Sequence, residues 1–131
     1  MMKKKVLFIC SQNRLRSPTA EHLYSETPNL EVASAGLNND AEVTVTPELL
    51  EWADLIFVME KSHRNKLSRK FRNSLRNKRV ICLNIPDDYA FMEPGLILFL
   101  KQELTPFLGP PLKEGTQQIR VSLNISSAKY F

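Results

Sequence analysis

Cysteine is scarce in this chain of 131 residues, and its two cysteines, Cys10 and Cys82, stand 72 positions apart. They form no Cys-x-x-Cys pair and no cluster with histidine, which excludes a disulfide-stabilised scaffold and a zinc ribbon. A chain of this length buries roughly two-thirds of its unfolded surface, so the fold requires neither disulfides nor a structural metal. We therefore expect an ordinary globular fold in a reducing compartment.

Long apolar runs and internal repeats are also absent. Lys3-Lys4-Lys5 precedes an apolar stretch that covers only Val6 to Cys10. This stretch is shorter than the core of a signal peptide or a membrane span. We expect a cytoplasmic protein with no membrane association.

Positive charge is concentrated in one segment. Residues 60–79 hold nine Lys or Arg against one Glu, a net charge of +8, whereas the rest of the chain sums to −4. Leu67, Phe71 and Leu75 recur every four positions, which predicts a helix over 61–75 with its basic face in solvent. A surface for an acidic partner or nucleic acid is the less favoured alternative.

Short apolar runs alternate with helical segments along the chain. The runs predict strands at 5–9, 31–36, 55–59 and 80–83, and the segments between and after them predict helices at 18–26, from 46, at 61–75 and at 95–108. Ser17 is the expected N-cap of the first helix and Pro18 its first residue. This alternation predicts an α/β fold in three layers, with a four-stranded parallel sheet and helices on both faces.

The pattern ends at Gly109-Pro110-Pro111. We expect a single domain over residues 1–108 and a C-terminal tail over 109–131. Apolar residues at 119, 121, 123 and 125 alternate with polar ones, which fits either an added edge strand or a disordered tail.

The polar loop after the first strand carries the chemistry. It places a cysteine and an arginine at its two ends, between a buried strand and a helix N-terminus, and reads Cys10-Ser11-Gln12-Asn13-Arg14-Leu15-Arg16-Ser17. Backbone N–H groups, the helix N-terminus and a guanidinium together bind a tetrahedral oxyanion. Such a field favours the thiolate of Cys10 as a nucleophile. Ser17 is placed to donate to the sulfur, and Asn13 suits a left-handed backbone position.

Several segments together resemble one family, the low-molecular-weight protein tyrosine phosphatases, whose loop is typically Cys-x-Gly-Asn-x-Cys-Arg-Ser directly after the first strand. The likeness covers residues 5–108 in order. It includes the loop, its continuation Arg16-Ser17-Pro18-Thr19-Ala20-Glu21, and then Ser34-Ala35-Gly36, Ala53-Asp54-Leu55-Ile56-Phe57-Val58-Met59 and Asp87-Asp88-Tyr89.

The resemblance implies a metal-independent phosphomonoester hydrolase that works through a phosphocysteine and needs no cofactor. It implies Cys10 as nucleophile, Asp87 as general acid and base, and Arg16 with the loop residues Ser11 to Ser17 as phosphate-binding groups. Tyr89 and Asp88 then form the substrate wall. The implied substrates are phosphorylated proteins or aryl phosphates, with inorganic phosphate as product.

The loop departs from the family pattern at several positions. Gln12 replaces a glycine, so the backbone there must avoid a positive φ or accept strain of ~1–3 kcal/mol. Leu15 replaces a second cysteine, and Ser11 and Arg14 occupy positions on the pocket wall. The segments between strands are short, which predicts a shallow pocket with Tyr89 as its main aromatic wall.

Other residues with reactive side chains favour structural interpretations. His63 has no partner in the sequence and is expected in solvent, and Cys82 lies in an apolar strand and is expected to be a buried, inert thiol. Two alternatives to a phosphatase remain. A thioredoxin-linked arsenate reductase normally needs two further cysteines, and only Cys82 is present. A binding module would keep the oxyanion pocket without turnover.

Overall fold

The computed structural model of the chain describes residues 3–111, in which four parallel strands form one sheet in the order β2-β1-β3-β4. The strands are β1 (Lys4–Cys10), β2 (Leu30–Gly36), β3 (Leu55–Val58) and β4 (Arg79–Cys82). The helices are α1 (Arg16–Tyr24), α2 (Pro47–Trp52), α3 (Lys61–Lys70) and α4 (Pro94–Leu108), with the short 3₁₀ helix η1 (Asn73–Leu75) after α3. The predicted α/β fold with a four-stranded parallel sheet is confirmed.

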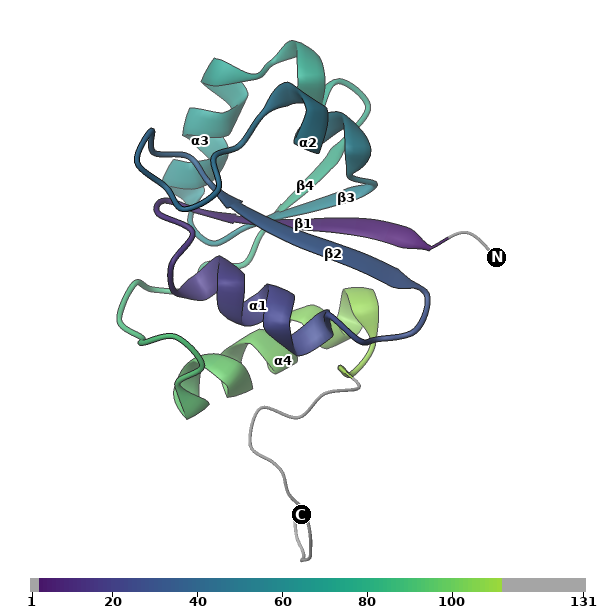
Figure 1. Cartoon of the computed structure of the whole chain (residues 1–131), viewed down its shortest axis with the longest axis vertical. Helices are drawn as coiled ribbons and strands as arrows, with labels where there is room; N and C mark the ends of the chain where they lie inside the picture. Colours follow the sequence, from purple (N-terminus) through teal and green to yellow (C-terminus); the bar gives the residue numbers. More distant parts are fainter. Residues whose placement is uncertain (1–2, 112–131) are drawn as a thin grey trace, which may run out of the picture.

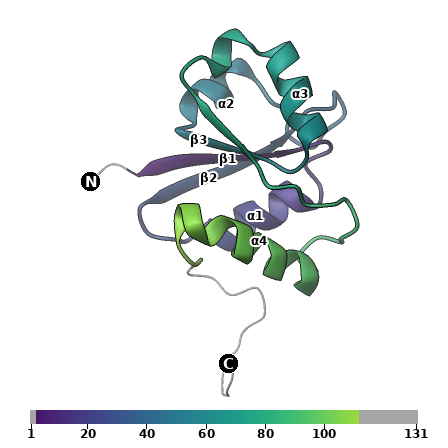
Figure 2. The same cartoon turned by 180° about the vertical axis from the view of Figure 1, so that it is seen from behind.

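The sheet separates two apolar cores, because successive side chains of a strand point to opposite faces. On β1, Val6, Phe8 and Cys10 belong to the core under α1 and α4, whereas Leu7 and Ile9 belong to the core under α2 and α3. Figures 1 and 2 show these two pairs of helices on opposite faces of the sheet. β1 is buried on both faces, and this is why it reads as a continuous apolar run.

The strand order creates a switch point beside β1. The chain leaves β1 toward β2 on one side and later returns to β3 on the other. In open parallel sheets, ligands bind at the carboxyl ends of the strands where the order reverses in this way. The loops that follow β1, β3 and β4 meet at this edge.

Two helix predictions need correction. The first helix begins at Arg16 with Leu15 as N-cap, so Ser17 lies inside the helix and does not cap it. The helix predicted over 61–75 ends at Lys70, and Phe71 leaves the helical conformation with φ −133° and ψ 37°. The 3₁₀ turn of η1 then returns Leu75 to the same apolar core as Leu67.

The basic side of α3 faces solvent, as expected from its pattern. Lys61, Arg64, Arg69 and Lys70 are exposed, while Leu67 is fully buried. No helix within residues 3–111 is long and apolar enough to span a bilayer. The alternation expected at 119–125 lies outside the described residues.

Candidate active site

The loop after β1 turns sharply between the strand end at Cys10 and the start of α1 at Arg16. Asn13 adopts the predicted left-handed backbone, with φ 58°. Gln12 does not have a positive φ, so the strain expected from the missing glycine does not arise. The tight turn therefore uses an asparagine, which tolerates this region better than most residues.

Hydrogen bonds aim at the sulfur of Cys10 from two directions. The backbone N–H of Asn13 donates to Sγ at 3.3 Å, and Ser17 Oγ lies 2.9 Å from Sγ. The Asn13 side-chain amide donates to Ser17 Oγ at 3.0 Å and to Ser34 Oγ at 2.8 Å, and Ser34 donates to the Glu21 carboxylate. Because Ser17 accepts from Asn13, its own hydroxyl hydrogen is available to the sulfur. Both donors stabilise a thiolate.

The segment after β2 supports the loop from behind. Leu37 N–H donates to the Cys10 carbonyl, Asn38 N–H to the Ser11 carbonyl and Glu42 N–H to the Gln12 carbonyl, each at 3.0 Å. Gly36 makes this close approach possible, since a Cβ there would lie 2.5 Å from the Ser11 carbonyl oxygen. The three loop carbonyls are thus hydrogen-bonded to backbone N–H groups of the segment after β2.

Arg16 is buried with only 3% of its surface exposed, and its guanidinium is held at the edge of the loop. Nη1 donates to Glu60 Oε2 at 2.5 Å and to the Ile85 carbonyl at 2.7 Å, while Nε lies 3.6 Å from Asp87 Oδ1. Glu60 follows β3, and Ile85 and Asp87 follow β4. Groups that follow two neighbouring strands, β3 and β4, therefore fix this guanidinium at the cavity that Cys10 also lines.

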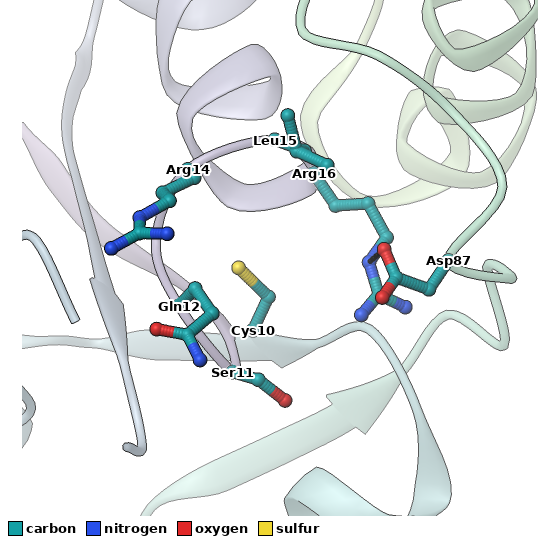
Figure 3. A pocket seen from close by; sticks show the side chains of 7 residues that line it. All are labelled: Cys10, Ser11, Gln12, Arg14, Leu15, Arg16 and Asp87. Carbon is teal, nitrogen blue, oxygen red and sulfur yellow. Dashed lines mark ion pairs between the residues drawn. The ribbon is translucent and has the colours of Figure 1, made fainter. Parts of the chain in front are cut away.

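A cavity of about 220 Å³ opens over this loop (Figure 3). Its lining comes from the loop and from the segment after β4, and consists of Cys10, Ser11, Gln12, Arg14, Leu15, Arg16 and Asp87. The structure thus brings together most of the residues expected at the site. Asn13 and Ser17 are buried and do not line the cavity, but both contact the Cys10 sulfur. Within residues 3–111, no three His, Cys, Asp or Glu side chains gather as a possible metal site.

The two adjacent aspartates differ in position. Asp87 lines the cavity opposite Cys10, and Figure 3 shows its carboxylate beside the Arg16 guanidinium. Asp88 is exposed and does not line the cavity. This difference is expected because successive side chains of an extended loop point in opposite directions.

The predicted aromatic wall is not formed in this geometry. Tyr89 packs against the core under α1 and α4. Its ring lies so close to Gly95 that a Cβ added to this glycine would be 3.2 Å from a ring carbon. Leu15, 36% exposed, supplies the apolar part of the cavity lining instead. Arg14 lines the same cavity, with Nε 3.5 Å from the Glu42 carboxylate.

His63 was expected in solvent, but it is buried beside the site. Only 4% of its surface is exposed. Nε2 lies 2.9 Å from Ser11 Oγ, and Nδ1 accepts the backbone N–H of Glu60 at 3.1 Å. The pKa of His63 is lowered to about 4, mainly because the ring is buried. The positive charges of Arg16 and Lys66 contribute to this lowering, whereas the carboxylates of Glu60 and Asp87 act to raise the pKa.

The sequence contains a signal for the positions of Glu60 and His63. Glu60 and His63 come immediately after the third predicted strand, whose carboxyl end must lie at the same edge as Cys10. A histidine at the third position of a helix can also reach back to the N-cap N–H, as the side chain does in a capping box. These two arguments indicate the sheet edge at which both residues lie, but only the strand order brings them beside the loop after β1.

Cys82 is half-buried and not fully buried as predicted. Its Sγ donates to the Asn84 side chain at 3.3 Å. It packs against the core under α2 and α3, whereas Cys10 belongs to the core under α1 and α4. The two thiols therefore extend from opposite faces of the sheet.

Comparison with known proteins supports the resemblance noted in the sequence. Residues 5–53 match the family model described as low molecular weight phosphotyrosine protein phosphatase. Comparison with curated protein sequences gives no match.

Solved structures of similar fold cover most of the chain. The tyrosine phosphatase Wzb from Escherichia coli K30, solved with phosphate, is 25% identical over 82% of this chain and 97% of its own, with a TM-score of 0.67. Wzb from Vibrio vulnificus, solved with benzylphosphonate, is 23% identical over 80% and 97% of the two chains, with a TM-score of 0.66. The YwlE arginine phosphatase from Geobacillus stearothermophilus is 18% identical over 76% and 83%, with a TM-score of 0.53.

The resemblance inferred from the sequence is confirmed by the match over residues 5–53 and by the shared architecture. The chain therefore has the fold of the low-molecular-weight protein tyrosine phosphatases, and its cysteine–arginine loop follows the first strand within the segment that matches this family.

Proposed function

We propose that this chain is a cytoplasmic phosphomonoester hydrolase that acts on aryl phosphates, including phosphotyrosine, through a phosphocysteine on Cys10. The observation that carries the proposal is the cavity in which the doubly hydrogen-bonded sulfur of Cys10 faces Arg16 and Asp87. The family match and the phosphate held by the Escherichia coli neighbour support a phosphatase.

In the first step, the thiolate of Cys10 attacks phosphorus and the bond from phosphorus to the leaving oxygen breaks. The loop N–H groups and the Arg16 guanidinium bind the equatorial oxygens, where negative charge develops. Asp87, in its protonated form, donates its proton to the leaving oxygen. The products of this step are the free alcohol or phenol and a phosphocysteine.

In the second step, water attacks the phosphocysteine. The Asp87 carboxylate accepts a proton from the water as its oxygen bonds to phosphorus, and the bond from phosphorus to sulfur breaks. Inorganic phosphate and the thiolate of Cys10 are released. The same carboxylate thus serves as acid in one step and as base in the next.

Leu15 supports a preference for aryl substrates. Its exposed side chain gives the cavity an apolar wall, which would contact a phenyl ring and leave a short serine side chain without an equivalent partner. Fold alone does not determine the substrate, since the similar folds include both tyrosine and arginine phosphatases.

Steady-state hydrolysis of p-nitrophenyl phosphate, beside phosphotyrosine, phosphoserine and phosphoarginine peptides, tests the proposal. We expect release of inorganic phosphate from the aryl phosphate and the phosphotyrosine peptide, with kcat/KM at least about tenfold lower for phosphoserine. Binding of phosphate with no turnover of any of these substrates would reject a hydrolase in favour of a binding module.

Cys82→Ser separates a phosphatase from an arsenate reductase. Because Cys82 lies across the sheet from Cys10, its loss should leave the rate of aryl phosphate hydrolysis within about threefold of wild type. Thioredoxin-coupled arsenate reduction is measured on the same two proteins. Robust reduction by the wild type that disappears in Cys82→Ser would contradict the phosphatase assignment.

A further inference from the structure

One buried side chain beside the cavity has no part in the two steps above. His63 is the third residue of α3, and its ring lies between the loop after β1 and the loop after β3. It contacts Ser11 on one side, the residue that follows Cys10. On the other side it contacts Glu60, the residue whose carboxylate holds Arg16.

The hydrogen bonds of the ring determine its tautomer. Nδ1 accepts the backbone N–H of Glu60, so Nδ1 carries no hydrogen. A neutral imidazole then carries its single hydrogen on Nε2, which donates to Ser11 Oγ 2.9 Å away. This direction is opposite to that of a serine–histidine nucleophile pair, in which the ring accepts the hydroxyl proton.

The orientation of the Ser11 hydroxyl follows from that tautomer. Its oxygen already accepts from His63, so its one hydrogen must point elsewhere, and Ser11 lines the cavity over Cys10. The acceptor that enters this cavity is an oxyanion. The Ser11 hydroxyl is therefore a preorganised donor to one oxygen of the oxyanion.

We propose that His63 is a positioning residue of the oxyanion site, a neutral Nε2-protonated imidazole that fixes Ser11 as a donor and holds the Glu60 backbone behind Arg16. The inference rests on the proposed function for its ligand, a tetrahedral oxyanion such as a phosphoryl group. We call the two hydrogen bonds of His63, to Ser11 and to Glu60, the clamp, because they join the two sides of the cavity.

Protonation would break the clamp, because Nδ1–H and the Glu60 N–H would then be two donors facing each other. The pKa of His63, lowered to about 4 by burial first and then by Arg16 and Lys66 against Glu60 and Asp87, keeps the ring neutral near pH 7. The unfolded chain binds this proton more readily than the folded one. The contribution of His63 to stability is therefore present above about pH 6.5 and is lost as the pH falls toward 4.

Two substitutions of His63 separate its two hydrogen bonds. His63→Asn keeps an acceptor near the Nδ1 position and loses the donor to Ser11, whereas His63→Gln keeps a donor near the Nε2 position and loses the acceptor for Glu60. Calorimetry with tungstate measures oxyanion affinity without turnover. We expect Kd to rise about tenfold in His63→Asn and in Ser11→Ala, which lose the donor for the oxyanion. In His63→Gln, which loses only the Glu60 contact, we expect a smaller rise of about threefold.

The double variant Ser11→Ala/His63→Asn tests whether the two residues act as one unit. Its Kd for tungstate should match that of Ser11→Ala within about twofold, and independent losses that multiply to about 100-fold would overturn the proposal. Arg64→Gln, on the exposed side of the same helix, is the matched control and should bind as wild type. Unfolding midpoints identify any variant that fails to fold.

Nitrogen-15 spectra of the His63 ring test the clamp even if the chain proves not to be a phosphatase. The clamp requires a neutral, Nε2-protonated ring at pH 7. A spectrum of an Nδ1-protonated or doubly protonated ring at that pH would overturn it. An Nε2-protonated ring with coupled tungstate binding but no hydrolysis would instead reject the proposed function and keep the clamp.

Discussion

Cys10→Ser is expected to lower the turnover of an aryl phosphate by on the order of 10⁴–10⁶-fold, the usual effect of removing a nucleophile that forms a covalent intermediate. The serine hydroxyl is not ionised near neutral pH, so the hydrogen bonds from Asn13 N–H and Ser17 Oγ no longer stabilise an attacking anion. Arg16 and the loop remain in place. The variant should therefore still bind phosphate, vanadate or tungstate.

Arg16→Lys is the matched control, because it should lose both binding and turnover. A lysine ammonium cannot reproduce the guanidinium that Glu60 and the Ile85 carbonyl hold at the cavity edge. Steady-state hydrolysis and calorimetric titration with tungstate are measured on both variants. Retained turnover in Cys10→Ser would rule out covalent catalysis at this residue.

Strands β1 and β3 could be predicted because each is an apolar run with a clear physical cause. β1 and β3 are buried on both faces, and burial of this kind needs continuous apolar sequence. The end of α3 was missed because Phe71 and Leu75 keep the helical spacing of Leu67. A 3₁₀ turn after the helix places Leu75 on the same core, so the apolar pattern did not reveal the break.

The site could be predicted where its residues are contiguous in sequence, and was missed where it depends on strand order. The loop from Cys10 to Arg16 is one segment, whereas Glu60 reaches Arg16 only because β3 lies next to β1. Ser17 was misassigned as a helix cap for a different reason. Its hydroxyl accepts from the Asn13 side-chain amide and lies 2.9 Å from the Cys10 sulfur, and these contacts within the loop replace a cap on a helix N–H.

The general acid is the last assignment to test, since two carboxylates are adjacent. Asp87→Asn should lower kcat for an aryl phosphate by roughly 10²–10⁴-fold, the usual contribution of a positioned acid. It should also flatten the alkaline limb of the pH–rate profile, where an acid loses its proton. Asp88 does not line the cavity, so Asp88→Asn should change kcat by less than about threefold.

Loss of rate alone does not identify the acid, because Asp87 also lies 3.6 Å from Arg16 Nε and its removal alters the partners of that guanidinium. The dependence on the leaving group separates the two effects. A dinitrophenyl phosphate releases an anion that needs little protonation, so Asp87→Asn should recover much of its lost rate with this substrate. Impaired orientation of Arg16 would instead slow both substrates equally. If Asp88→Asn shows the large defect and the recovery while Asp87→Asn shows neither, Asp88 is the acid.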